Sequence, residues 1–310
     1  MGIDSVLGLL YLLKAPTVDL RAITIANGVA QVKPGGRNAL RILELTGHKD
    51  IPVALGPEQP LKGTRAFPSF WREQANALGD VRLSETSLKA RREDAASLIV
   101  STLRDSKTPV TLVAMGPLTN IALALQQIQK APDAATLQKK IAAIIVMGGA
   151  LDAPGNVDKP FMGIKNSVAE WNFYLDPQAA QMTFDAARQA GISIRLLTLD
   201  ATHALPLTTE FVDTIRRAPR DQTSNLLLAL LDAVKGSIEG GYYYFWDTLA
   251  AVAAANPEVL SFHEETVSIV TQDGNTLGQL RRDPNGTRVQ IGEEINRATF
   301  EERYRKAVLD

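Results

Sequence analysis

Asp247 is the residue of this sequence best placed to do chemistry. It follows an aromatic run at residues 242–246 and precedes an alanine-rich apolar stretch at residues 249–255. Aspartate is unfavourable inside a helix but favourable at the N-cap and in the first turn, where the helix dipole attracts negative charge. Asp247 is therefore expected at a helix N-terminus, next to aromatic rings. There it either caps the helix and does nothing more, or serves a functional site.

Glu170 and Asn172 form a second candidate pair. They lie two residues apart, after the long irregular segment at residues 150–169. On an extended segment, side chains at positions i and i+2 point the same way, so both could hydrogen-bond one hydroxylated ligand. A pair of solvated loop residues would show the same pattern.

The composition excludes several kinds of site. The chain has no cysteine and three histidines, His48, His203 and His263. It therefore has no disulfides, thiolate zinc sites or cysteine nucleophiles, and a metal site would use oxygen ligands, which favours calcium or magnesium. The net charge of −1 provides no electrostatic footprint for nucleic acid or for an anionic membrane.

Size and composition are those of a soluble globular protein. A length of 310 residues, with 45% hydrophobic and 22% charged residues, fits one large α/β domain, and we expect a single domain over residues 1–310. The apolar run at residues 6–13 is too short to cross a bilayer and lacks a preceding basic region. It is expected to be a buried helix.

Short, nearly continuous apolar runs alternate with helical patterns along the chain. The expected helices lie at residues 4–14, 34–47, 91–105, 117–130, 176–190, 208–217 and 223–238, after Asp247, and from Asn296 onward. The expected strands lie at residues 18–26, 51–55, 109–114, 141–147 and 192–199, with hairpins around Asp273-Gly274 and Asn285-Gly286. Residues 56–80 are expected to be a loop. This order predicts an α/β fold, with a mostly parallel central sheet flanked by helices.

Sheets of this kind bind ligands beyond the carboxyl ends of their strands. The polar or glycine-rich segments that follow the expected strands are therefore candidates for the site. They are Asn27-Gly28, Met115-Gly116, residues 148–172 and residues 200–203. Phosphate binding at Gly148-Gly149 is disfavoured, because neither a Walker lysine nor a Gly-x-Gly-x-x-Gly pattern follows.

Five motifs of this sequence occur together, in the same order, in one enzyme family. They are Arg37-Asn38-Ala39-Leu40-Arg41-Ile42-Leu43-Glu44-Leu45, Gly116-Pro117-Leu118-Thr119-Asn120, Met147-Gly148-Gly149-Ala150, Ala169-Glu170-Trp171-Asn172 with Asp176-Pro177, and Phe245-Trp246-Asp247. Over essentially its whole length, the chain resembles the inosine–uridine-preferring nucleoside hydrolases. The resemblance implies a nucleoside hydrolase-like fold and an enzyme that cleaves the N-glycosidic bond of ribonucleosides to base and ribose, with a calcium ion held by aspartates.

The family's signature is an N-terminal loop, Asp-x-Asp-(Pro or Met)-Gly-x-Asp-Asp, that follows the first strand. Met1-Gly2-Ile3-Asp4-Ser5 resembles its second half, with Asp4 on the third aspartate and Ser5 on the fourth. We therefore expect the first strand to be missing, with Met1 an internal position of a longer chain. The family's catalytic base, the second aspartate, would then lie upstream of Met1, so that no catalytic aspartate is retained.

By this resemblance, three calcium ligands remain: Asp247, the backbone carbonyl of Met115, and the hydroxyl of Ser5 in place of a carboxylate. Calcium takes about six to eight oxygens, several of them anionic. A serine hydroxyl brings no charge, so calcium binding is expected to be weak or absent.

The ligands of the ribose are better retained. The resemblance assigns Glu170 and Asn172 to the 5′ side of the ribose, joined by either Asn166 or Asn156, and assigns Asp4 to ribose hydroxyls. These residues predict a nucleoside as the bound partner.

Departure of the base needs assistance, and some family members place a histidine before the aspartate of the last motif. Here that position is Trp246, and Trp71 is a second aromatic that could face it. Purine-preferring relatives stack the base between aromatic rings. We hypothesise that both indoles stack on a flat base such as a purine, at roughly 1–3 kcal/mol per stack, with Trp246 stabilising the leaving group. Either tryptophan could instead pack in the core.

Two functions remain open at this point. In the first, water held by calcium and deprotonated by an upstream aspartate attacks C1′ through an oxocarbenium-like transition state. In the second, which Ser5 favours, the chain is an inactive paralogue or a nucleoside- or ribose-binding protein. We expect a homo-oligomer, dimer or tetramer by resemblance, without nucleic acid or membrane partners. A cytoplasmic location is expected, unless a secretion signal precedes Met1.

Overall fold

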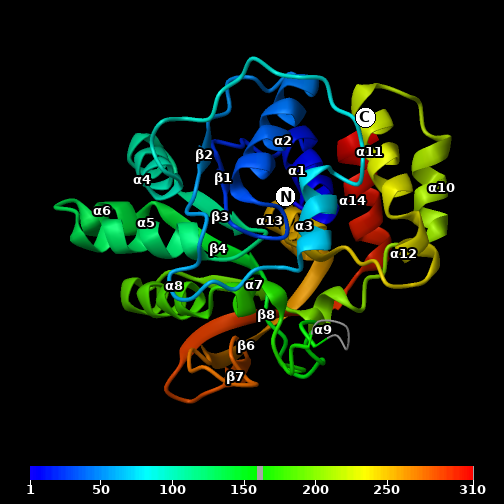
Figure 1. Cartoon of the computed structure of the whole chain (residues 1–310). Coiled ribbons are helices and arrows are strands. Elements are labelled where there is room, and N and C mark those ends of the chain that lie inside the picture. Colours follow the sequence, from blue (N-terminus) through cyan, green and yellow to red (C-terminus); the bar gives the residue numbers. More distant parts are fainter. Residues whose placement is uncertain (159–162, 310) are drawn as a thin grey trace.

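The structure is a computed structural model that describes residues 1–158 and 163–309. Within these residues, six strands form one sheet in the order β3-β4-β5-β8-β6-β7 (Figure 1). They are β3 (Val110–Ala114), β4 (Ile141–Met147), β5 (Ile194–Leu197), β8 (Thr287–Ile295), β6 (Leu260–Ile269) and β7 (Leu280–Arg282). The first four are parallel, whereas β6 is antiparallel to both of its neighbours. A separate parallel pair consists of β1 (Ile23–Ile25) and β2 (Val53–Leu55).

Strand β4 shows why this sheet is covered on both faces. Its residues alternate between two buried clusters: Ile145 and Met147 belong to one, and Ile144 and Val146 to the other. Side chains of a strand point alternately to opposite faces, so a strand buried on both faces must be apolar throughout. The predicted α/β fold with a mostly parallel central sheet is confirmed.

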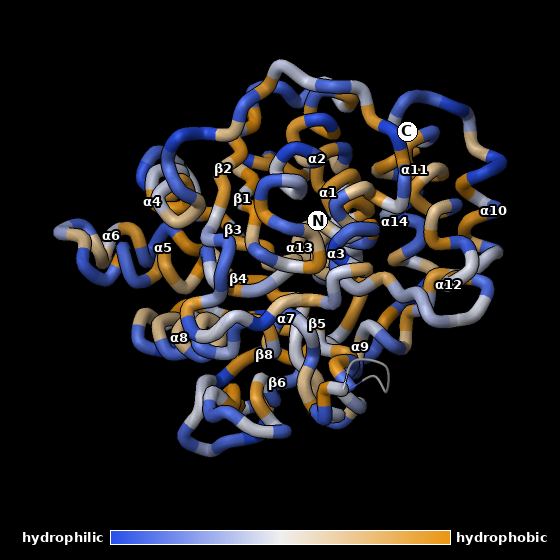
Figure 2. Tube along the Cα trace, in the orientation of Figure 1, coloured by the Kyte–Doolittle hydropathy of each residue, from blue (hydrophilic) through white to orange (hydrophobic). Residues whose placement is uncertain are grey.

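Helices pack on both faces of the sheet. They are α1 (Ile3–Lys14), α2 (Val32–Leu45), α3 (Ser69–Asn76), α4 (Ala95–Asp105), α5 (Thr119–Lys130), α6 (Ala134–Lys139), α7 (Trp171–Leu175), α8 (Pro177–Ala190), α9 (Leu199–Thr202), α10 (Thr209–Arg217), α11 (Gln222–Ala233), α12 (Lys235–Glu239), α13 (Trp246–Ala255) and α14 (Arg297–Leu309). Helices α1 and α13 pack together near the centre, and α13 also contacts β3, β4 and β5 (Figure 1). Hydrophobic residues gather around this pair, whereas the outer surface of α10 is hydrophilic (Figure 2).

Asp176 joins three segments that are far apart in the sequence. Its buried carboxylate caps α8 by accepting the N–H of Ala179 at 3.1 Å. It also accepts the hydroxyl of Thr119 at 2.6 Å and the N–H of Leu61 at 2.9 Å. This contact explains why two of the motifs, around Thr119 and around Asp176, occur together.

Several expected elements differ from those observed. Residues 56–80 are not all loop, because α3 begins directly after Pro68. Only Ala75 of this helix is buried. The expected helix 223–238 is divided at Val234 into α11 and α12, and the first expected strand, 18–26, is reduced to β1. Helices α6, α7 and α9, each of six residues or fewer, were not predicted.

No helix in the described part of the chain is both long enough and apolar enough to span a bilayer. The apolar run at residues 6–13 is part of α1, in agreement with the expectation of a buried helix.

Candidate functional site

The N-terminal turns of α1 and α13 meet at Asp247. The hydroxyl of Ser5 donates to Oδ2 of Asp247 at 2.6 Å, and both side chains are buried. The hydroxyl of Thr248 donates to the carbonyl of Asp4 at 3.4 Å. Asp247 lies in the first turn of α13, whose N-cap residue is Phe245, so the structure selects the first-turn position over the N-cap.

Gly8 lets α1 approach both α13 and the end of β3. A Cβ at this position would lie 3.2 Å from the carbonyl oxygen of Asp247 and 2.8 Å from Sδ of Met115. The structure thus brings together the residues assigned to the metal, Asp247, Met115 and Ser5, and places Asp4 beside them.

The buried carboxylates of Asp247 and Glu170 and the half-buried carboxylate of Asp4 influence one another at this point. Burial, followed by the neighbouring charge of Asp4, raises the pKa of Asp247 well above its ordinary value, and Glu170 adds to this rise. Burial also raises the pKa of Asp4. Asp247 and Glu170, remote in sequence, therefore belong to one electrostatic cluster, which we call the acidic cluster (Asp4, Glu170 and Asp247).

The backbone of Glu170 is extended, but the helix α7 begins at the next residue and includes Asn172. Glu170 is the N-cap of α7, and its two carboxylate oxygens accept the N–H groups of Asn172 at 2.8 Å, Gly149 at 3.0 Å and Phe173 at 3.3 Å. Burial raises its pKa to about 7 although these three donors oppose the rise. The expectation that Glu170 and Asn172 project side by side from extended backbone is wrong, because Asn172 lies in the first turn of the helix that Glu170 caps.

Asn172 nevertheless remains available to a ligand. Its Nδ2 donates to the carbonyl of Met147 at 3.0 Å, at the carboxyl end of β4. This bond fixes the side-chain amide, and within the described residues its Oδ1 accepts no hydrogen bond. A ligand hydroxyl can therefore donate to Oδ1.

The structure distinguishes between Asn156 and Asn166, which the sequence left as alternatives. Asn166 is buried, and both the nitrogen and the oxygen of its side-chain amide are hydrogen-bonded. Its Nδ2 donates to the carbonyl of Leu277 at 2.8 Å, and its Oδ1 accepts the N–H groups of Ala169 at 3.0 Å and Val168 at 3.3 Å. Asn156 is half-buried, and its Oδ1 accepts the N–H of Trp171 at 3.0 Å. Its Nδ2 donates to no described residue, so Asn156 is the better ligand donor beside Glu170.

The two indoles of the proposed base site belong to different aromatic groups. Trp71, on α3, lies with its ring centroid 5.9 Å from that of Trp171 and 6.1 Å from that of Phe67. Trp246 packs against Tyr243 at 5.2 Å and Tyr244 at 5.4 Å. Each tryptophan thus packs against neighbouring rings, as the core-packing alternative requires, and stacking on a base stays a prediction.

Sequence reasoning missed Tyr243 at this site. Tyr243 hydrogen-bonds the backbone of Asp4, and burial raises its pKa well above the ordinary value. The aromatic run at residues 242–246 was a visible signal, but it did not specify which ring would reach Asp4. Asn27 follows β1, and its Oδ1 accepts Nη2 of Arg72 at 2.6 Å.

The comparisons with known proteins agree with this geometry. The family model "Inosine-uridine preferring nucleoside hydrolase" matches residues 1–302. The chain is 33% identical to the pyrimidine-specific ribonucleoside hydrolase RihA of Citrobacter koseri, over 89% of this chain and 84% of that protein. It is 29% identical to uridine nucleosidase 1 of Arabidopsis thaliana, over 89% and 79%.

The chain belongs to the inosine-uridine preferring nucleoside hydrolase family. Its fold is similar to that of the purine-preferring ribonucleoside hydrolase from Gardnerella vaginalis, with a TM-score of 0.84, 26% identity, and coverage of 99% of this chain and 95% of that one. The resemblance seen in the five sequence motifs is thereby confirmed, and so is the assignment as a nucleoside hydrolase.

Calcium, the metal of this nucleoside hydrolase family, fits the residues present only in part. Within residues 1–158 and 163–309, no three His, Cys, Asp or Glu side chains are grouped as a metal site. Asp4, Asp247, the Met115 carbonyl and Ser5 supply fewer anionic oxygens than a shell of six to eight requires, and the Ser5 hydrogen is directed at Asp247. The donor set does not fit a resident calcium ion.

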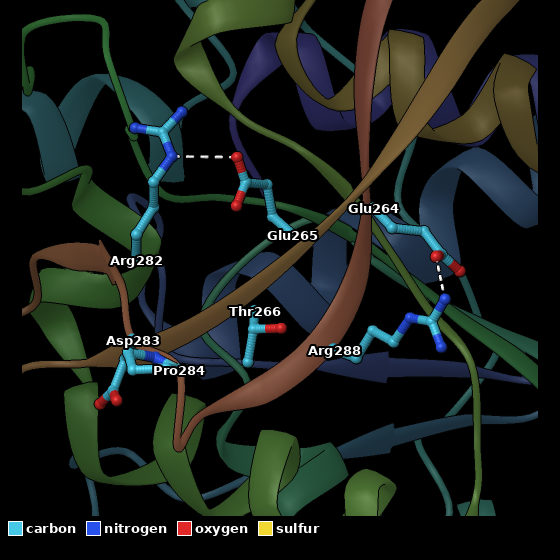
Figure 3. A pocket seen from close by; sticks show the side chains of 7 residues that line it. All are labelled: Glu264, Glu265, Thr266, Arg282, Asp283, Pro284 and Arg288. Carbon is cyan, nitrogen blue, oxygen red and sulfur yellow. Dashed lines mark hydrogen bonds and ion pairs between the residues drawn. The ribbon is translucent and has the colours of Figure 1, made fainter.

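A surface pocket on the antiparallel strands is separate from the acidic cluster. It is lined by Glu264, Glu265, Thr266, Arg282, Asp283, Pro284 and Arg288 (Figure 3). Arg282 pairs with Glu265 at 2.9 Å and with Asp152 at 2.7 Å, and Arg288 pairs with Glu264. Because the charges of these two arginines are compensated within the chain, we assign no ligand to this pocket.

Glu170→Gln should flatten the pH dependence of stability. Burial raises the pKa of Glu170 from its ordinary 4.5 to about 7, so between these values the folded state holds a proton that the unfolded chain has lost. The free energy of unfolding then falls by about 3 kcal/mol as the pH rises through this interval. Chemical denaturation at a series of pH values measures this slope.

The matched control for this measurement is Glu73→Gln, which changes an exposed carboxylate on α3. It should leave the slope of the wild-type protein unchanged. A Glu170→Gln protein with the wild-type slope would show that Glu170 is not buried as described.

Asn156→Ala should mainly weaken nucleoside binding, whereas Asn166→Ala should mainly lower stability. Loss of Asn156 should weaken nucleoside binding about tenfold, equivalent to about 1.4 kcal/mol, with little loss of stability. Loss of Asn166 leaves buried backbone groups unpaired and should lower the free energy of unfolding by about 2–3 kcal/mol. Calorimetric titration and denaturation of both variants measure this. The reverse pattern would identify Asn166 as the ligand residue.

Proposed function

We propose that this chain binds a ribonucleoside with its ribose between the acidic cluster and the two amides Asn156 and Asn172, and cleaves the N-glycosidic bond. The single observation that supports this placement is the convergence of Asp4, Asp247 and Glu170 from three separate elements. In this arrangement Asp4 takes ribose hydroxyls, and Glu170, Asn172 and Asn156 take the 5′ hydroxyl.

The cluster also suits the transition state. Cleavage at C1′ passes through an oxocarbenium-like state that carries positive charge on the sugar. Buried carboxylates stabilise such charge more strongly than solvated ones, because little water screens them. Burial is the largest cause of the elevated pKa values of Asp247 and Glu170, and the negative charge of Asp4 adds to both.

For the leaving group we propose that Trp246, with Trp71, stacks on the base. Neither is a proton donor comparable to histidine, so the base departs as an anion or takes its proton from water. Uracil and hypoxanthine spread that negative charge onto carbonyl oxygens, whereas cytosine and adenine carry an amino group at the corresponding position. We therefore propose uridine and inosine as preferred substrates.

We also propose that the carboxylate that activates water does not come from residues 1–310. In any longer form of the chain, residues before Met1 would supply it. Support comes from the position of Met1, since a Cβ on Gly35 would lie 3.1 Å from the Met1 nitrogen and 3.2 Å from Ile25, the last residue of β1. Within the described residues β1 is not hydrogen-bonded to β3, so a further parallel strand could pair there.

A second candidate function is nucleoside binding without hydrolysis. The observation that favours it is Ser5, whose hydroxyl meets Asp247 where the family has a carboxylate. In this case the ribose contacts persist, and calcium binds weakly or not at all.

Release of ribose from inosine, uridine, adenosine and cytidine distinguishes the two candidates. We expect inosine and uridine to react at least about tenfold faster than the other two, a difference of about 1.4 kcal/mol in barrier. Asp247→Asn should lower the rate about 100-fold. The assay should include any longer form that the reading frame encodes.

Binding without ribose release in every form would support the second candidate. Neither binding nor release would contradict both. Equal rates for all four nucleosides would contradict the account of the leaving group.

We propose further that the protein is a cytoplasmic homo-oligomer, a dimer or a tetramer. Its resemblance to family members of these sizes supports the oligomer. Light scattering coupled to size-exclusion chromatography should give a mass of two or four chains, and a monomer would contradict the proposal.

A further inference from the structure

A short buried contact between side chains at the site joins Ser5 to Asp247. The distance from Oγ to Oδ2 is 2.6 Å, and the two residues are 7% and 5% exposed. The bond connects the first turn of α1 to the first turn of α13, across 242 positions of sequence. A hydroxyl that donates to a carboxylate is a charge-assisted hydrogen bond, which is stronger than a neutral one.

This bond closes a tightly packed pair of helices. Gly8, one turn after Ser5, leaves no room for a side chain between α1 and the backbone of α13. Thr248 reaches back from α13 to the carbonyl of Asp4. The two helix ends are thus connected by hydrogen bonds in both directions, and any change at Ser5 acts directly on the position of Asp247.

The residue type at position 5 determines whether this helix junction can bind a cation. The negative charges of Asp4 and Glu170 act unfavourably on Asp247, and the buried α-amino group of Met1 offsets them in part. A third carboxylate next to Asp247 would be strongly unfavourable unless a cation compensated it. A hydroxyl adds no charge and supplies a hydrogen to one oxygen of Asp247. Within the described residues no set of metal-binding side chains is complete.

We propose that the Ser5 hydroxyl takes the place of a bridging cation at this junction, so that the protein holds Asp247 without a resident metal, and that Ser5→Asp would convert the junction into a calcium site. The proposal concerns the helix junction and not the hydrolysis. It is tested by measuring stability and cation binding. The proposal can therefore be wrong while the proposed function is right, and the proposed function can be wrong while this proposal is right.

The first test removes the hydroxyl. Ser5→Ala should lower the melting temperature by about 4 °C, equally in EDTA and in millimolar calcium, because an oxygen of buried Asp247 loses its donor. The wild-type protein should show no calcium-dependent change in melting temperature. Ser106→Ala is a matched control, since Ser106 is also buried and donates at 2.6 Å, but to the carbonyl of Thr108, far from Asp247 in sequence. It should not alter the response to calcium.

The second test adds the charge. Ser5→Asp should be less stable than the wild-type protein in EDTA, and millimolar calcium should raise its melting temperature by about 5 °C or more. Ser5→Asn has the same shape without the charge and should not respond to calcium. Isothermal titration with calcium chloride should detect binding to Ser5→Asp alone among these proteins.

Three outcomes would overturn the proposal. The first is a wild-type protein that calcium stabilises as much as Ser5→Asp, which would make Ser5 a working ligand. The second is a Ser5→Asp protein that does not respond to calcium, or does not fold even in its presence. The third is a Ser5→Ala protein as stable as the wild type, which would remove the role of the hydroxyl.

Discussion

The gathering of three carboxylates, two of them buried, at one edge of the sheet is the constraint on which this structure depends. Asp4, Asp247 and Glu170 repel one another, and each loses hydration on folding. Such an arrangement persists only where every carboxylate is held by donors and by rigid elements. Ser5 donates a hydrogen bond to Asp247, and three backbone N–H groups donate hydrogen bonds to Glu170. The contacts that stabilise these two carboxylates therefore also fix their orientation.

The need for such hydrogen-bond donors explains why the residues of the site lie at the N-terminal ends of helices. Asp247 and Asp4 lie in the first turns of helices, and Glu170 caps another, where unpaired N–H groups favour negative charge. The loops after parallel strands bring such helix ends to one edge. In the proposed function, this edge supplies the negative charge near C1′ and the hydrogen-bonding groups around the ribose.

The sequence predicted the parts that depend on local pattern. Continuous apolar runs located β4 and the neighbouring strands, and Asp176-Pro177 located the start of α8. The aromatic run before Asp247 located the helix that carries it. The backbone at Asn172 was wrongly predicted to be extended, because α7 has five residues and no periodicity that a sequence window could detect. The choice between Asn156 and Asn166 was equally out of reach, since it depends on the distant carbonyl of Leu277.

The central claim is that the ribose binds between the acidic cluster and the amides of Asn156 and Asn172. A crystal structure with a non-hydrolysable nucleoside analogue tests it most directly. The account predicts the 2′ and 3′ hydroxyls within hydrogen-bonding distance, about 3 Å, of Asp4 and Asp247, and the 5′ hydroxyl at the same distance from Glu170 and Asn172. A ribose bound elsewhere, or turned so that its hydroxyls contact none of these four side chains, would contradict it.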